Sequence, residues 1–496
     1  EDHCMSSTLE RTATGPSSTT TKPIHAWLRQ LRVGYVADET SAEMDEFAER
    51  LLEQFAVLGH EALDIPEGHI DVLFATARYG EPVPWRQSLF FTARRRFGLE
   101  NDPELFTLVD MTVEEYESAL QHFENVLDRE PPDPADFEFP GLAPESYRVL
   151  VEQGRRGGPI LALERLVQAH AKSIWVILVV GDGEPLWVHY FDLVGAHPKI
   201  ELADKAGYQD LVMRIVTVMS TEEVTHHQAV GEPLPNADWA DSAGRKGMLK
   251  AGPALGRRNF FTEMVRISDL VQVPAVSQGV ANQYSEGCFA TWDPGLGALI
   301  STVTGSARPV EKDDLKDQDL AVIVGVRDDG LGALVRHVER KQNDPPSSEA
   351  VELMDMDSLL PRVELDGTQV PVVRSKLHGH RGIGSYDPDL VEYAPLDPPY
   401  YHYPVSCATS AQAEGIKGAF SRAESLLNPD DPRQLAFTVL PGHGVIIAEK
   451  WVPEKAPFQL IWETMDSGAL QVDNHVPQGV YGYAVNSEGA MVLDVS

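Results

Sequence analysis

The fold at the start of the chain is decided by the stretch Arg32-Val33-Gly34-Tyr35-Val36-Ala37, a short apolar run that predicts a β-strand. A helix is expected next, over residues 41–58, because apolar side chains recur along one stripe and Thr40 and Glu43 have the spacing of a capping box. Apolar runs at residues 62–65 and 71–77 then predict two more strands. This β-α-β order implies parallel pairing with a right-handed crossover.

A second unit of the same kind is expected further along the chain. The first predicted domain covers residues 23–130, and a Pro- and Asp-rich linker at residues 130–136 separates it from a second domain at residues 144–317. In this second domain the apolar run at residues 174–180 is typical of a parallel strand that is buried on both faces. We therefore predict two doubly wound, Rossmann-like α/β units.

The pattern changes after about residue 318, where short strands between tight turns predict a β-rich domain over residues 318–496. Asp366-Gly367, between two alternating runs, is a strong signal for a two-residue hairpin turn. One helix is expected over residues 410–427, and strands over 435–440 and 445–450. The expected fold class is α/β: two doubly wound units followed by a mainly antiparallel α+β domain.

Charge and cysteine content restrict the classes of partner and of compartment. The chain has 496 residues and a formal net charge of -35, so its field repels nucleic-acid phosphates and anionic membranes. The 3 scattered cysteines do not suit a disulfide framework. No apolar run approaches the roughly 18 residues that span a bilayer. We expect a cytoplasmic protein whose Ser- and Thr-rich residues 1–22 form a disordered tail.

Three common catalytic or nucleotide-binding motifs are absent from the sequence. No Gly-x-Gly-x-x-Gly follows the first strand, and no Gly-x-x-x-x-Gly-Lys-Ser/Thr occurs at a strand-to-helix junction. The sequence also lacks the Gly-x-Ser-x-Gly elbow of serine hydrolases. Dinucleotide binding, P-loop chemistry and this type of serine hydrolase are therefore not expected.

The expected functional stretch places two carboxylates and a thiol among small residues, before an apolar segment that we expect to be helical: Tyr284-Ser285-Glu286-Gly287-Cys288-Phe289-Ala290-Thr291-Trp292-Asp293-Pro294. Glu286 is the first candidate for a functional carboxylate. Asp293 has two interpretations, because Asp before Pro294 is also a common helix start in which Asp caps the helix. Both are candidate catalytic residues and metal ligands.

Four histidines in the last third of the chain are candidate metal ligands. His378 and His380 would lie on the same side of an extended strand, while His443 and His475 are expected in loops. Each could complete a site with Glu286 or Asp293, because a divalent ion accepts carboxylate oxygens together with one or two imidazoles. The alternative for each histidine is a surface or hydrogen-bonded structural role.

Residues 244–258 form a Gly-rich segment with an unusual density of positive charge for so acidic a chain. Lys250, Arg257 and Arg258 are candidate ligands for a phosphate or carboxylate group of a substrate. The alternative interpretation is an exposed, flexible loop without a ligand.

The segment from Glu286 to Gly305, with the apolar run 296–300 before Val303-Thr304-Gly305, resembles the central motif of the L-fucose isomerase-like family. The resemblance implies two α/β domains before a β-rich domain, and a divalent metal ion, manganese, that bridges adjacent oxygens of an open-chain sugar. Glu286 and Asp293 would then be ligand or base. One of His378, His380, His443 or His475 would be the imidazole ligand.

The resemblance further implies a metal-dependent carbohydrate-active enzyme, an aldose–ketose isomerase that moves a proton between neighbouring carbons through an enediol. Two alternatives stay open: a non-catalytic sugar- or metabolite-binding or scaffold protein, and a metal-dependent lyase or hydrolase on the same framework. The expected partner is a small-molecule substrate, a sugar or sugar derivative. A homo-oligomer is left open.

Overall fold

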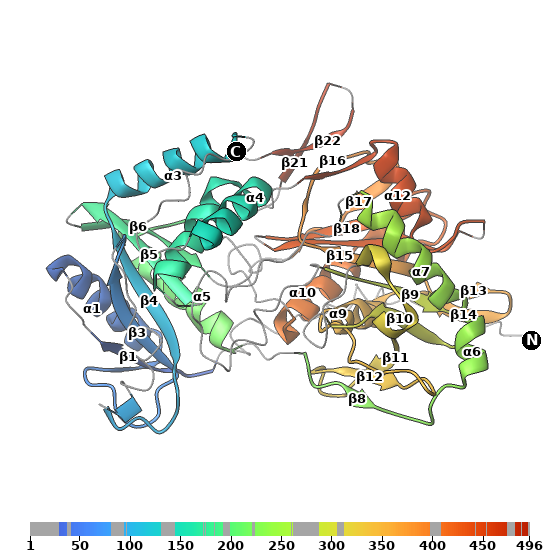
Figure 1. The fold of residues 1–496 in the computed structure, drawn as a ribbon, viewed down its shortest axis with the longest axis horizontal. Coiled ribbons are helices and arrows are strands. Elements are labelled where there is room, and N and C mark those ends of the chain that lie inside the picture. Colours follow the sequence, from blue (N-terminus) through green and yellow to red (C-terminus); the bar gives the residue numbers. More distant parts are fainter. Residues whose placement is uncertain are drawn as a thin grey trace, which may run out of the picture.

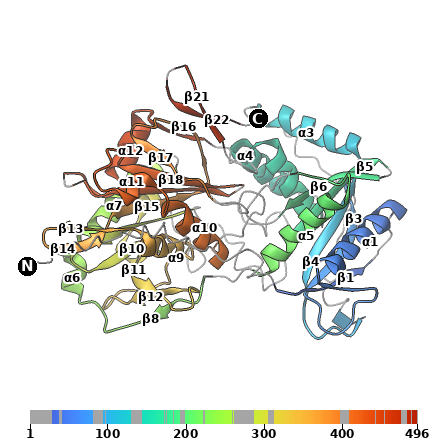
Figure 2. The same ribbon diagram turned by 180° about the vertical axis from the view of Figure 1, so that it is seen from behind.

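The computed structural model describes residues 29–36, 41–80, 94–95, 97–129, 144–171, 173, 175–182, 184–191, 199–220, 224–258, 260, 287–304, 312–396, 408–441, 443–452, 454–473, 482–487 and 489–494. Mixed helices and strands in several sheets agree with the α/β class. Two large sheets, one in each half of the chain, form lobes that lie side by side (Figure 1), as the view from behind also shows (Figure 2). The expected tail at residues 1–22 lies outside the described residues.

The N-terminal lobe is built on one sheet of seven strands in the order β2-β1-β3-β4-β5-β6-β7. Its parallel strands are β1 (Arg32–Val36), β2 (Glu61–Leu63), β3 (Val72–Arg78), β4 (Glu104–Met111) and β5 (Trp175–Asp182). Antiparallel pairing adds β6 (Glu184–Phe191) and β7 (Ile200–Glu201). Because β4 pairs directly with β5, the strands expected in two separate α/β units belong to one sheet.

Helices cover both faces of this sheet. One face carries α1 (Ala42–Val57) and α5 (Lys205–Ser220), and the other carries α3 (Val113–Leu127) and α4 (Pro144–Ala171). Thr112 and Glu115 have capping-box spacing in the sequence, which predicts the start of α3, and the box is present: the Glu115 amide donates to the Thr112 hydroxyl at 3.1 Å and the Thr112 amide donates to the Glu115 carboxylate at 2.8 Å. Helix α1 is capped by Ser41, whose side chain accepts from the Met44 amide, so the cap lies one residue after the predicted Thr40 and the prediction is wrong there.

The C-terminal lobe is built on a sheet of nine strands in the order β17-β18-β19-β15-β9-β10-β11-β12-β8. In chain order these are β8 (Gln228–Ala229), β9 (Cys288–Asp293), β10 (Ala298–Thr302), β11 (Leu320–Val326), β12 (Ala333–Arg336), β15 (Val373–Gly379), β17 (Val391–Tyr393), β18 (Leu435–Leu440) and β19 (Gly444–Lys450). All pairs are antiparallel except those at the two edges, as expected for the C-terminal part.

The segment after Asp293 is a β-hairpin, so the prediction of a helix there is wrong. Strands β9 and β10 are buried along their whole length and pair with each other around a turn at residues 294–297. A run of five apolar and small residues between glycine-containing turns suits a strand buried on both faces better than a helix. Because β10 also pairs with β11, this sheet crosses the domain boundary expected near residue 318.

Two layers of helices enclose the nine-stranded sheet. One face is covered by α6 (Asn236–Asp241), α7 (Ala243–Gly256) and α12 (Gln459–Asp466), which pack in the same core as Phe289 and Leu377. The other face is covered by α9 (Ala350–Asp355), α10 (Ser410–Phe420) and α11 (Glu424–Leu427). The Gly-rich segment 244–258 is therefore mainly the packed helix α7 and not a flexible loop.

Smaller elements complete the lobe. The predicted Asp366-Gly367 turn joins β13 (Arg362–Leu365) to β14 (Thr368–Pro371). A four-stranded sheet contains β16 (Gly382–Tyr386), β20 (Leu470–Asp473), β21 (Gly482–Val485) and β22 (Met491–Asp494). Short 3-10 helices are η4 (Lys312–Asp314), η5 (Asp317–Asp319) and η6 (Met356–Leu359). Within the described ranges, no helix has both the length and the apolar character needed to cross a bilayer.

A buried carboxyl group, Glu449 on β19, binds the start of α12. It accepts hydrogen bonds from the amides of Phe458 at 2.8 Å, Leu460 at 3.1 Å and Ile461 at 3.3 Å, and from the Ser375 hydroxyl at 3.0 Å. Glu449 thereby satisfies amide groups that the first turn of a helix leaves without partners. Burial raises the pKa of Glu449 to about 7, although these donors favour the ionised form.

This raised pKa makes stability depend on pH in a defined direction. The folded protein holds the Glu449 proton more tightly than the unfolded chain does. Protonated Glu449 therefore adds to the free energy of unfolding, fully below the ordinary pKa of 4.5, and this stabilisation is lost as the pH rises through about 7. Urea unfolding of the wild type and of Glu449→Gln should show the wild type losing roughly 2–3 kcal/mol relative to the variant between pH 5 and pH 8. An unchanged difference between the two proteins would contradict the raised pKa.

Candidate metal centre

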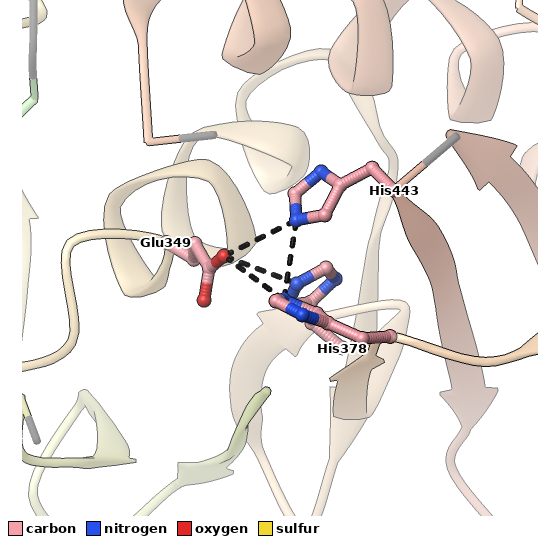
Figure 3. Close-up of side chains that lie close together, drawn as sticks. Glu349, His378 and His443 are labelled. Carbon is pink, nitrogen blue, oxygen red and sulfur yellow. Dashed lines mark hydrogen bonds and ion pairs between the residues drawn. The ribbon is translucent and has the colours of Figure 1, made fainter. Parts of the chain in front are cut away.

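Four side chains that can bind a metal ion converge on the face of the nine-stranded sheet covered by α9 and α10. Glu349, His378, His380 and His443 each offer one ligand atom, and no two of these atoms are more than 4.8 Å apart. Nε2 of His378, His380 and His443 lie 3.1, 3.9 and 3.7 Å from Oε1 of Glu349. Figure 3 shows the side chains of Glu349, His378 and His443 pointing toward one another.

Three separate parts of the chain supply these ligands. His378 is the next-to-last residue of β15 and His380 follows the strand, so the alternation of side chains along extended backbone puts both on one side, as predicted. His443 lies in the turn between β18 and β19, and β19 pairs with β15 so that Val445 lies opposite Gly379. Glu349 is the residue before the first turn of α9.

Two glycines allow neighbouring strands to approach the end of β15. A Cβ atom on Gly444 would lie 2.1 Å from the carbonyl oxygen of Gly379, and a Cβ atom on Gly287 would lie 2.4 Å from that of His378. Gly287 also has a φ of +79°, which side chains rarely tolerate. Any larger residue at Gly444 would push the turn that carries His443 away from β15.

The backbone behind His378 fixes how its ring presents a ligand atom. Nδ1 of His378 lies 3.2 Å from the carbonyl oxygen of Val445, and only a protonated nitrogen can donate to this acceptor. In the neutral imidazole the proton on Nδ1 leaves Nε2 with its lone pair directed at the cluster. A carbonyl behind the ring is the usual support of a metal-binding histidine.

The cluster is buried, and its members shift the pKa values of Glu349 and His443. His378 is fully buried and Glu349 and His443 are each only 6% exposed, whereas the His380 side chain is 13% exposed. Burial opposes ionisation of Glu349, but His378 and His380 hold its pKa well below the ordinary value. Burial and the other two imidazoles hold the pKa of His443 well below its ordinary value. An ionised carboxylate and a neutral imidazole are the forms that bind metal ions.

The donor set and its spacing fit a divalent transition-metal ion. Two nitrogen or oxygen ligands of the same ion, each about 2.1 Å away, are at most about 4.2 Å apart. The three distances to Glu349 and the 3.2 Å between Nε2 of His443 and His380 satisfy this limit, whereas the overall spread of up to 4.8 Å slightly exceeds it. Imidazole nitrogens with one carboxylate oxygen and no thiolate suit zinc, iron, nickel or manganese.

Three of the four residues are predictable from the sequence, and Glu349 is not. His378, His380 and His443 were candidates, and the structure brings them together. Glu286 and His475 lie outside the described residues. Glu349 carries no local signal, because an acidic residue in front of an apolar helical run is a common helix start. Only the tertiary structure, in which its side chain meets His378 of β15, brings Glu349 into the cluster.

Asp293 is not part of this cluster. Its Oδ2 accepts hydrogen bonds from the Ser242 hydroxyl at 2.5 Å and the Gly244 amide at 2.8 Å, and its Oδ1 accepts from the Leu296 amide at 3.0 Å. It lies at the opposite end of β9 from Cys288, the residue that pairs with His378. The expected helix start at Asp293-Pro294 is therefore wrong, and Asp293 instead binds the Gly244 amide in the first turn of α7, whose N-cap is Ser242.

The predicted anion-binding cations are also placed elsewhere. Arg258 follows α7 and forms an ion pair with Asp466, while Lys250 and Arg257 are exposed. Helix α7 packs on the face of the sheet opposite α9, so the structure does not bring these three cations to the histidine cluster.

A second buried carboxyl group lies one helical turn after Glu349. Oε2 of Glu352 accepts a hydrogen bond from the Gln412 amide group at 3.2 Å, and Glu352 is fully buried. Burial, and then repulsion from Glu349, raise the pKa of Glu352 well above its ordinary value. Two neighbouring carboxyl groups therefore differ in charge tendency: Glu349 favours the ionised form and Glu352 favours the protonated form.

Comparisons of the chain with models of protein families, with curated proteins and with solved structures found no match. The cluster of three imidazoles and one carboxylate is thus the most specific pointer to function.

The close contact at Gly444 gives a testable consequence. Gly444→Ala should lower the free energy of unfolding by about 1–3 kcal/mol, because the added methyl group meets backbone that cannot rotate away. The control is Gly325→Ala on β11, where a Cβ atom would make an ordinary contact of 3.5 Å with Leu334. Thermal and urea unfolding of both variants would check this, and equal losses in both would contradict the close approach.

Proposed function

We propose that the protein is a metal-dependent enzyme whose divalent ion is held by Glu349, His378, His380 and His443. The convergence of three imidazoles and one carboxylate in one buried cluster is the observation that carries this proposal. Such a cluster suits a divalent ion, because these ions accept a carboxylate oxygen together with imidazole nitrogens.

The donor set favours a catalytic ion over a purely structural one. Structural zinc sites are usually closed by four ligands that include cysteine thiolates. Ions that accept six ligands, such as manganese, would keep positions open for substrate oxygens when four come from the protein. His380 is the least buried of the four residues, which makes its side the natural approach for a substrate.

The reaction that we propose is the interconversion of an aldose and a ketose, as the resemblance to the L-fucose isomerase-like family implies. A bound divalent ion supplies polarisation of a carbonyl oxygen, and a nearby group must hold and release the proton that moves. Glu352 is our candidate for that second role among the described residues, since it follows Glu349 by one helical turn, and burial and repulsion from Glu349 raise its pKa. A lyase or hydrolase would use the same centre.

Metal analysis tests the centre directly. We expect about one equivalent of a divalent transition metal in the purified wild type by inductively coupled plasma mass spectrometry, and a loss in Glu349→Gln and His378→Ala because each removes one ligand. Matched controls are Glu364→Gln and His337→Ala, which change exposed residues. Wild-type protein without stoichiometric metal after incubation with manganese, zinc and iron(II) would refute the proposal.

The proposed isomerisation has a specific isotopic signature. Proton transfer through an enediol should introduce deuterium from heavy water at the carbon next to the carbonyl, which NMR detects in a panel of aldoses and ketoses. We expect turnover in the metal-loaded wild type and a decrease of at least about 100-fold in Glu352→Gln, the range of a lost acid–base group. Full metal occupancy without turnover of any sugar would favour the lyase, hydrolase or binding alternatives.

A further inference from the structure

A fully buried lysine lies two residues before His378 on the same strand. Nζ of Lys376 donates a hydrogen bond to the carbonyl oxygen of Leu353 at 2.6 Å and forms an ion pair with Asp357. Leu353 belongs to α9 and Asp357 to η6, which continues from it. The lysine therefore contacts the C-terminal part of the segment whose first residue is the metal-ligand candidate Glu349.

One strand thus holds α9 at both ends. Lys376 and His378 project from the same face of β15, because side chains two residues apart in a strand do so. His378 contacts Glu349 before the first turn of α9, and Lys376 contacts the Leu353 carbonyl near its last turn. An ammonium group at the C-terminal end of a helix also interacts favourably with carbonyl groups that lack helical partners.

Stability by itself does not explain a buried ion pair at this place. Burial lowers the pKa of Lys376 and raises that of Asp357, and their mutual attraction opposes both shifts. Replacing such a pair by apolar residues of similar volume is often neutral or stabilising. What the pair does supply is a directional contact between β15 and the C-terminal part of the α9–η6 segment, whose helix packs over β9, β10 and β11.

We propose that Lys376, through Asp357 and the Leu353 carbonyl, is the positioning residue that sets the carboxylate of Glu349 among the three imidazoles. This role rests on the proposed metal centre. Metal ligands must lie within about 0.5 Å of their working positions, so a small slide or rotation of α9 along β15 would remove Glu349 from the ligand set. Lys376 itself does not touch the ion.

The other attachments of α9 supply a matched control. Lys417 on α10 forms an ion pair with Asp355 at 2.9 Å, so it also joins a lysine to an aspartate of α9. Unlike Lys376, Lys417 is partly exposed and belongs to an element that provides none of the four candidate ligands. Lys417→Met removes a Lys–Asp contact of α9 but leaves the contacts between α9 and β15 unchanged.

The experiment compares full-length wild type with Lys376→Met/Asp357→Leu and with Lys417→Met. The double substitution avoids leaving one buried charge unpaired. Zinc affinity is measured by competition with a chelator, cobalt(II) absorption reports the ligand set, and circular dichroism with thermal unfolding of the metal-free protein reports folding. We expect the double variant to fold, to bind zinc about 10–100-fold more weakly and to show an altered cobalt spectrum, while Lys417→Met keeps wild-type affinity.

Adding Glu349→Gln supplies a readout that a merely structural role would not change. If Lys376 acts through Glu349, this substitution should weaken zinc binding in the wild type and have little further effect in the double variant. Unchanged zinc affinity and an unchanged cobalt spectrum in the folded double variant would overturn the positioning role. Equal losses in the double variant and in Lys417→Met would overturn it as well.

Two further outcomes are also decisive. If the double variant does not fold, the isosteric Asp357→Asn takes its place, and wild-type zinc affinity in that variant would overturn the positioning role. If the wild type itself binds neither zinc nor cobalt, the proposed metal centre fails, and the positioning role fails with it. Binding by the wild type with no change in the variants refutes the positioning role alone.

Discussion

The pairing of β15 with β9 on one side and β19 on the other is the constraint on which the C-terminal lobe depends. It places Leu377 in the core under α7 and turns His378 toward α9. The same pairing brings the turn before β19, with His443, to the end of β15. Because Gly287 and Gly444 meet the backbone of β15 without side chains, the three strands can close around one point.

The electrostatics of the lobe separate two kinds of buried carboxyl group. Glu449 accepts hydrogen bonds from amide and hydroxyl donors, and these bonds hold the start of α12 against β19. Glu349 instead faces three imidazole rings, whose nearest nitrogens lie 3.1–3.9 Å from one of its oxygens. Shared protons or a bound cation would each be attracted by such a group of imidazoles and a carboxylate. The cluster around Glu349 could therefore hold a metal ion, whereas the donors around Glu449 form a structural cap.

Prediction from sequence succeeded where a pattern is short-ranged. The capping box of α3 and the Asp366-Gly367 turn depend on neighbours only a few residues away, and both are present. The expected helix after Asp293 failed for the opposite reason. Its run of apolar residues has no period of its own, and burial between β9 and β11 makes it a strand. Likewise, the linker before residue 144 suggested two units, but β4 and β5 share one sheet.

By itself the sequence determined that His378 and His380 share one side of a strand, since the period of extended backbone requires it. It also marked His443 as a loop residue between two strands. Only the tertiary structure decided that these three meet Glu349 and that Asp293 does not join them. The ligands come from segments many residues apart, and only the packing of β15, β19 and α9 brings them together. Local sequence patterns do not encode that packing.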